Sequence, residues 1–217
     1  MPDYTWVPGI SGSGRYRNQS TGRFVNPSEV RNDLDLYLQA SNEPIKALSE
    51  QLRSGAINIA DWQTTMMTEI KNAHLNAIAE TVGGYENMTP EHNGRAGAYI
   101  REQYKFLRDF ANQIEDGTQP MDGTISRRSQ LFIKAGRESY YKSIHAQLGS
   151  GTASHVRSIR FPGDSCEECK GFDGVWFVLG SSAYKLPGNR ICNKNCRCSE
   201  QYGTLQEDGS IRTVGNA

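Results

Sequence analysis

The chain has 217 residues, of which 36% are hydrophobic and 22% charged, a composition typical of folded proteins and not of disordered ones. Lys and Arg together number 24, as do Asp and Glu, so no overall charge directs the chain to nucleic acid or to a membrane surface. The sequence contains no apolar run near the roughly 20 residues that span a bilayer, and its start lacks the features of a signal peptide. We therefore expect a soluble protein made in a reducing cytoplasm, with no membrane partner.

Residues 1–26 are predicted to form an extended N-terminal arm, because glycine and proline interrupt them and no helical period appears. Such an arm either docks its aromatic side chains on a neighbouring chain or is a frayed terminus. Its basic residues are the candidate nucleic-acid contacts: Arg15, Arg17 and Arg23. The alternative is that these arginines are solvated or pair with acids of a neighbouring subunit.

Residues 27–150 are predicted to form a helical domain, because apolar residues recur there at helical spacing. Capping residues mark four or five helix starts, near Ser28, Ser41 or Asn42, Asn58, Thr89, and Thr124 or Ser126. Stop signals follow the later helices at Gly55, Gly83, Asp116 and Gly149. Short connections between amphipathic helices indicate an antiparallel bundle or a stack of helical hairpins.

Residues 151–203 are predicted to form a small β-rich module. Alternating residues between Val156 and Phe161 indicate one short strand, and Val175–Leu179, after an Asp-Gly turn, indicates another. Residues 180–195 are loop-like, and residues 204–217 form a C-terminal tail in which Asp208 and Gly209 could turn a hairpin. The predicted fold class is α+β, mainly α, with an antiparallel helical domain followed by a small metal-knuckle module.

All five cysteines fall in this module, at Cys166, Cys169, Cys192, Cys196 and Cys198. An odd, clustered set in a chain without secretory features favours metal over a disulfide framework. A Cys-x2-Cys turn places two thiolates where both can bind one ion at about 2.3 Å. Structural zinc is the predicted cofactor, with apparent binding energy on the order of 10–16 kcal/mol to support a module too small to be secure alone. Disulfides and free thiols are the alternatives, and the spacing does not decide which four thiols bind.

No enzyme is predicted. The histidines, at positions 74, 92, 145 and 155, are scattered and expected on helix surfaces or in caps, and no HExxH motif occurs. Cys166 is not expected to precede a helix in the βαβ pattern of a thioredoxin-like redox site. Catalytic zinc sites keep an open position and usually include histidine or a carboxylate. A thiol-based enzyme is the least favoured alternative.

The segment Phe161-Pro-Gly-Asp-Ser-Cys-Glu-Glu-Cys169 is followed by Phe172-Asp-Gly174, Phe177 and Asn195-Cys-Arg-Cys198. This pattern resembles the C-terminal signature of tailed-phage minor head proteins, the head-morphogenesis family that includes the phage Mu minor head protein. The preceding helix, with Arg137-Glu-Ser-Tyr-Tyr141, is similar in layout. The family's histidine falls at Asn193, so the resemblance implies that the adjacent Cys192 takes its role as a ligand.

The resemblance implies a virion protein that is assembled in the host cytoplasm and present in several copies. Its expected partners are the portal or other phage head proteins, with packaged DNA as a further partner. The resemblance thus implies a non-enzymatic role in head assembly. The alternative is a zinc-knuckle nucleic-acid-binding protein that accompanies packaged DNA.

Overall fold

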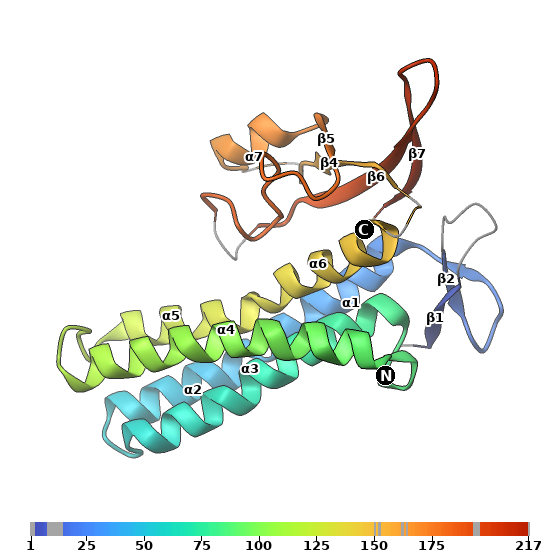
Figure 1. Ribbon diagram of the computed structural model, residues 1–217. Coiled ribbons are helices and arrows are strands. Elements are labelled where there is room, and N and C mark those ends of the chain that lie inside the picture. The colour runs from blue at the N-terminus through green and yellow to red at the C-terminus, as the bar shows by residue number, and fades with distance from the viewer. Residues whose placement is uncertain are drawn as a thin grey trace.

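The computed structural model describes residues 3–7, 15–149, 151, 153–161, 163, 165–192 and 196–216. It shows a long helical body, with a small sheet near the N-terminus and a β-rich module that lies along one side of the body (Figure 1). The predicted fold class, α+β and mainly α, is confirmed. None of the helices in the described ranges is both long enough and apolar enough to cross a membrane.

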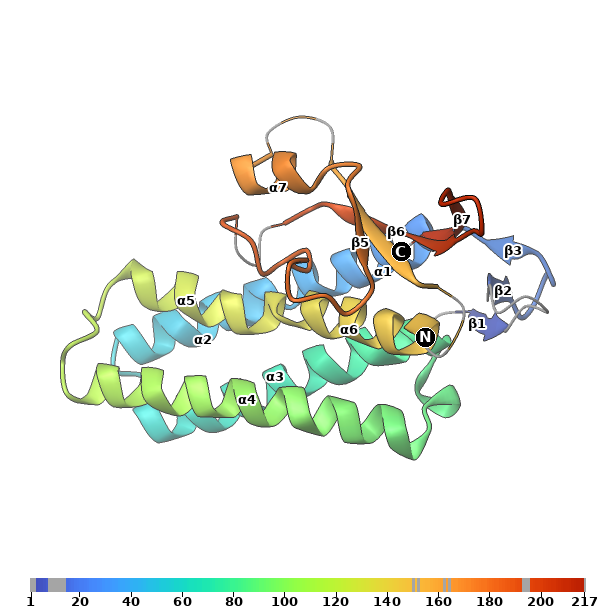
Figure 2. The same ribbon diagram turned by 45° about the horizontal axis from the view of Figure 1, so that its top comes forward.

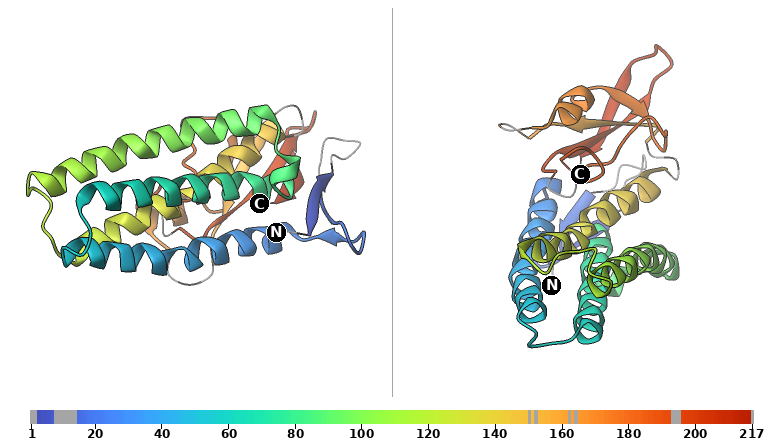
Figure 3. Two further views of the ribbon diagram at one scale, coloured as in Figure 1. Left: turned by 90° about the horizontal axis from the view of Figure 1, so that it is seen from below. Right: turned by 90° about the vertical axis from the view of Figure 1, so that its left-hand side faces the viewer.

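The body consists of α1 (Pro27–Ala40), α2 (Asn42–Arg53), α3 (Ile59–Val82), α4 (Pro90–Glu115), α5 (Gly123–Lys134) and α6 (Gly136–Gly149), with a short 3-10 turn, η1 (Tyr85–Asn87), before α4. The helix pairs α1–α2 and α5–α6 follow one another almost without interruption, because the joining residues, Ser41 and Ala135, keep helical backbone angles. The body therefore forms four antiparallel rods (Figure 3).

The helix starts agree with the sequence in part. Asn58 caps α3 by accepting a hydrogen bond from the Asp61 amide at 2.8 Å, and Thr89 caps α4 as predicted. The predicted side-chain cap at Ser41 is absent from the α2 start. The predicted last helix is in fact two, and Asp122, not Thr124 or Ser126, caps the first of them.

Helix α3 is the centre of the body and packs against all five of the other long helices. Its core-facing side chains are fully buried, and the Trp62 ring meets Phe110 of α4 edge-on at 5.5 Å between ring centroids. Burying a large apolar side chain contributes about 1.5–3 kcal/mol, so this face of α3 supplies much of the stability of the body.

Residues near the N-terminus form a sheet and not the predicted extended arm. Strands β1 (Tyr4–Val7), β2 (Arg15–Asn18) and β3 (Phe24–Val25) pair antiparallel in that order. Side chains alternate between the two faces of a strand, and Tyr4 and Tyr16 are buried against the body. The Tyr4 hydroxyl donates to the Glu80 carboxylate, and the Tyr16 hydroxyl donates to the Thr81 carbonyl at 3.4 Å. Tyr4 and Tyr16 thus dock within their own chain, whereas Phe24 is exposed.

The contact between β1 and the end of α3 gives a sharp test of this packing. Gly83 ends α3 with a φ of 83°, and a Cβ there would overlap the Tyr4 carbonyl and come within 2.5 Å of the Thr5 Cα. We expect Gly83→Ala to lower the free energy of unfolding by about 3 kcal/mol, because left-handed strain and a backbone clash add together. Urea denaturation measures this loss.

Gly55 is the matched control. It has a φ of 75° at the end of α2, and a Cβ there would meet nothing within 4 Å. Gly55→Ala is therefore expected to cost about 1 kcal/mol, the left-handed strain alone. Equal losses in the two variants would contradict the close packing of β1 on α3.

The C-terminal module contains β4 (His155–Ile159), α7 (Glu167–Phe172), β5 (Trp176–Val178), β6 (Ser199–Leu205) and β7 (Ile211–Asn216). Its strands form an antiparallel sheet in the order β5-β4-β6-β7. Both predicted strands are present, and the chain turns at Asp208 and Gly209 as expected. The predicted tail, residues 204–217, is thus largely part of the sheet, and the module extends to residue 216.

The module lies over α6 and the adjacent part of the body (Figure 2). Tyr141 and Ile144 of α6 belong to the same hydrophobic cluster as Val156, Tyr184 and Tyr202 of the module. The apolar core therefore continues from the body into the module, which fixes the module's position on α6.

Candidate metal centre

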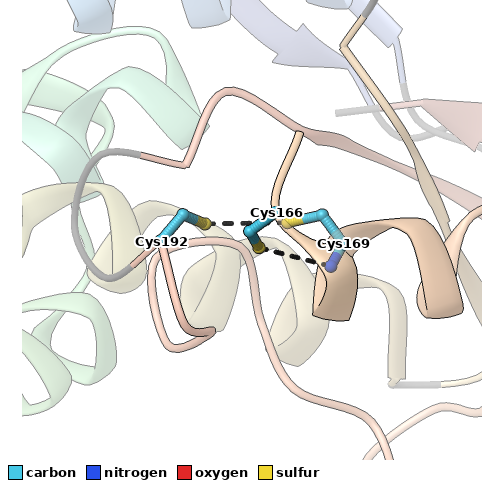
Figure 4. Close-up of side chains that lie close together, drawn as sticks. All are labelled: Cys166, Cys169 and Cys192. Carbon is cyan, nitrogen blue, oxygen red and sulfur yellow. Dashed lines mark hydrogen bonds between the residues drawn. The ribbon is translucent and has the colours of Figure 1, made fainter. Parts of the chain in front are cut away.

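The Cys-x2-Cys pair is built on the first turn of α7. Cys166 precedes the helix as its N-cap, and its sulfur accepts a hydrogen bond from the Cys169 amide at 3.4 Å. Both thiols therefore face the same side of the turn (Figure 4). Cys166 does precede a helix, but β4 and β5 on either side of α7 are antiparallel, so this helix does not belong to the βαβ pattern that the sequence excluded.

Helix α7 also holds the loop that supplies the third thiol. The Glu168 carboxylate accepts a hydrogen bond from the Ile191 amide at 2.6 Å and contacts Lys185 Nζ at 2.5 Å. Ile191 directly precedes Cys192, so these contacts bring Cys192 back to the start of α7. The predicted loop is confirmed over residues 180–192, whereas 193–195 lie outside the described residues.

All five predicted ligands gather at one place. The Cys169 sulfur is 3.6 Å from that of Cys192 and 3.7 Å from that of Cys196. Cys166, Cys169 and Cys192 form one group whose sulfurs lie within 4.8 Å of one another, and Cys169, Cys196 and Cys198 form a second. Disulfide sulfurs are only about 2.05 Å apart, and the five thiols are free. The cluster can hold a metal ion, with Cys169 common to both groups.

The thiols differ in their affinity for protons. Burial raises the pKa of Cys169 and of Cys192. Hydrogen bonds donated mainly by Cys198 lower the pKa of Cys196 to about 5, and its own donation raises the pKa of Cys198. Thiolate is the form that binds metal, so the lowered pKa of Cys196 favours metal binding at this sulfur.

A buried cation lies behind the thiols. Arg190 is only 4% exposed, and its Nη1 lies 3.7 Å from the Cys169 sulfur. The guanidinium also donates to the Ser158 hydroxyl at 2.8 Å and lies 4.7 Å from the centroid of the Phe172 ring. A positive charge here partly balances the negative charge that several thiolates bring into one small volume.

Two side chains of α6 hold the second half of the cluster. The Tyr141 hydroxyl donates to the Cys198 carbonyl at 3.0 Å, and the Arg137 guanidinium donates to the Cys196 carbonyl. Arg137 also pairs with Asp35 of α1, with its Nε 3.0 Å from the carboxylate. The Cys-Arg-Cys segment is thus anchored to the helical body through its backbone.

The buried carboxylate of Glu200, two residues after Cys198, links the module to α6. Glu200 is 1% exposed and accepts hydrogen bonds from the Tyr184 hydroxyl, at 2.9 Å, and from the Tyr202 hydroxyl. His145 Nε2 of α6 lies 2.8 Å from the same carboxylate. His145 therefore occupies an interface and not the helix surface or cap that the sequence suggested.

The other histidines lie apart from the thiols. His92 has the expected capping role in α4, and His74 is buried beside the Ser139 hydroxyl at 2.6 Å, not on a helix surface. His155 lies in β4. Asn193, the position of the histidine in the resembling family, is outside the described residues.

No protein-family model, curated protein or solved structure matches this chain.

The predicted nucleic-acid contacts do not join the thiols. Arg15, Arg17 and Arg23 belong to the N-terminal sheet and the turn before β3, where Arg15 lies over the Phe24 ring at 5.1 Å and Arg17 donates to the Gly22 carbonyl. All three are exposed.

Proposed function

We propose that the protein is a non-enzymatic structural component of a tailed-phage head, a minor head protein that acts during head assembly. The observation that carries this proposal is the joint placement of the resembling segments. The Cys-x2-Cys turn, the strand with Phe177 and the Cys-Arg-Cys segment lie in one module. The Arg- and Tyr-rich part of α6, which also resembles the family in layout, holds that module through Arg137 and Tyr141.

The proposal gives the thiol cluster a structural zinc ion. Four sulfurs at about 2.3 Å from a tetrahedral zinc lie about 3.8 Å from one another, close to the 3.6 and 3.7 Å that separate Cys169 from two of its neighbours. An all-thiolate set suits a closed site, because catalytic zinc keeps a position for water or substrate. Zinc would supply folding energy to the module and set the path of residues 166–198.

In this role the helical body packs against the portal or other head proteins, in several copies, and the zinc module keeps its shape on α6. The near-continuous rods α1–α2 and α5–α6 make an elongated body (Figure 1), a shape that suits a part held between larger proteins. Catalysis plays no part in the proposal, because the cluster offers thiols in excess and its buried charged residues are engaged in structural contacts.

Purified particles test the proposal. In cells that produce particles of the phage encoding this chain, we expect mass spectrometry of purified heads to find it in several copies together with the portal protein. A Cys169→Ser chain is expected to be depleted from the particles, whereas Ser165→Ala, which changes the same hollow without removing a thiol, is expected to enter them normally. Heads that lack the wild-type chain although the cells produce it would refute the proposal.

A further inference from the structure

A cavity lies between α1 and the module, and it shares Phe161 and Arg197 with the hollow that contains the thiols. It has a volume of about 480 Å³, and its walls contain cations from four separate segments: Arg31 of α1, Lys134 of α5, Arg137 of α6, and Arg197 between two of the thiols. Asp35 is the one carboxylate among the described residues that line it. This basic cleft is therefore a place where positive charge converges.

The one carboxylate among the described lining residues is already engaged. Asp35 is held by Arg137, which approaches it with both Nε and Nη2. Arg31 and Arg197 form no ion pair within the described parts of the chain. The pKa of Lys134 is lowered, first by burial and then by the charge of Arg137, because the cations repel one another. A bound anion would relieve this repulsion.

The wall of the basic cleft also has features that suit a planar organic group. The Phe161 ring is 47% exposed, and the Arg197 guanidinium lies over it, 5.7 Å from the ring centroid. The buried side-chain oxygen of Asn42 has no hydrogen-bond partner among the described residues.

We propose that the basic cleft binds the phosphate of a nucleotide unit, with Arg31, Lys134 and Arg197 around the phosphate and the base against Phe161. Phosphate carries more charge than a carboxylate and offers three strong acceptor oxygens, so it can use cations that approach from different segments. The cavity exceeds the size of a phosphate group and leaves room for an attached sugar and base, and bases stack on exposed aromatic rings. This site goes beyond the role in head assembly, and its residues differ from the arginines of the N-terminal sheet.

Fluorescence anisotropy with a labelled oligothymidylate, in competition with thymidine monophosphate, tests the site. We expect the double variant Arg31→Gln, Arg197→Gln to lose at least about tenfold in affinity, because it removes two cations that form charge-assisted hydrogen bonds to the phosphate. The matched control, Arg101→Gln with Arg108→Gln, removes the same charge from exposed positions on α4 and is expected to change affinity by no more than about twofold.

The two probes distinguish the source of the phosphate. Comparable binding of the mononucleotide and the oligonucleotide indicates a free nucleotide, whereas binding of the oligonucleotide alone indicates a nucleic-acid strand. Arg31→Gln alone must also weaken binding several-fold, with unchanged metal content, since Arg31 belongs to α1 and does not line the hollow that contains the thiols. Failure of the wild-type protein to bind either probe, equal losses in the control, or equally effective displacement by polyglutamate would overturn the proposal.

Discussion

Replacing Cys169 with serine is expected to release the bound metal and unfold residues 155–216 while the six long helices persist. Cys169 is the one thiol that belongs to both close groups, so its loss leaves neither group complete. Under the proposed function, a structural zinc contributes apparent binding energy on the order of 10 kcal/mol to the folding of the module. Elemental analysis of freshly reduced protein should find about one zinc per wild-type chain and almost none in the variant.

Hydrogen exchange locates the unfolding in the same experiment. Amides of β4 and β6 should lose protection in Cys169→Ser, whereas amides of α3 should keep it. Because the apolar core continues from α6 into the module, we also expect the helices to melt a few degrees earlier, by about 2–4 °C. Ser165→Ala is the control, and unchanged metal content and melting in Cys169→Ser would refute the structural role of the metal.

The same assay identifies the surplus thiol. A structural zinc binds about four ligands, and the cluster offers five. Among serine variants at the remaining positions, one is expected to retain metal and the others to lose it. That comparison settles the ligand set, which neither the spacing in the sequence nor the two overlapping groups of thiols decides.

Removing the carboxylate of Glu200 is expected to be the most damaging change outside the thiols. Glu200→Ala leaves two buried tyrosine hydroxyls, of Tyr184 and Tyr202, and the ring of His145 without their common partner. Deleting one member of a buried polar network costs about 3–5 kcal/mol, because the remaining groups stay desolvated. Urea denaturation followed by circular dichroism measures the loss.

Glu207→Ala is the matched control for this prediction. Glu207 is exposed in the turn between β6 and β7, so the change removes the same charge from a position beside the same sheet. Surface substitutions of this kind usually stay within about 0.5 kcal/mol. Losses of similar size in the two variants would show that Glu200 does not link the module to α6.

The helices could be predicted from the sequence because their signals are local. Asn58 and Thr89 each cap the helix that follows them, and the apolar period runs within each segment. The joint at Ala135 was missed because the backbone there keeps helical angles, and the local signal at this point is a single glycine, Gly136, which an α-helix tolerates. The N-terminal sheet was missed for a different reason. Burial of Tyr4 and Tyr16 depends on Glu80 and Thr81, which are distant in sequence.

The thiol cluster was likewise predictable, because cysteine spacing is itself a short-range signal. The residues that support the cluster were not. Arg190 and Glu200 both contact the Tyr184 hydroxyl. These contacts depend on strand pairing and on packing against α6, which the sequence does not reveal. The basic cleft depends on still longer separations, since Arg137 meets Asp35 across about a hundred positions. Local sequence patterns do not predict contacts between residues so far apart in the chain.

The joints at Ser41 and Ala135 have a mechanical consequence. Helix α1 packs on α6, and α2 packs on α5. The two joints therefore lie at the same height along the body, between the α1–α6 pair and the α2–α5 pair. Asn42 and Lys134 line the basic cleft from one side of the joints, and Leu38 and Arg137 line it from the other side. Bending of the rods at these joints would therefore change the distances between the cations. A ligand bound in the cleft would contact residues on both sides of the joints and so restrict that bending.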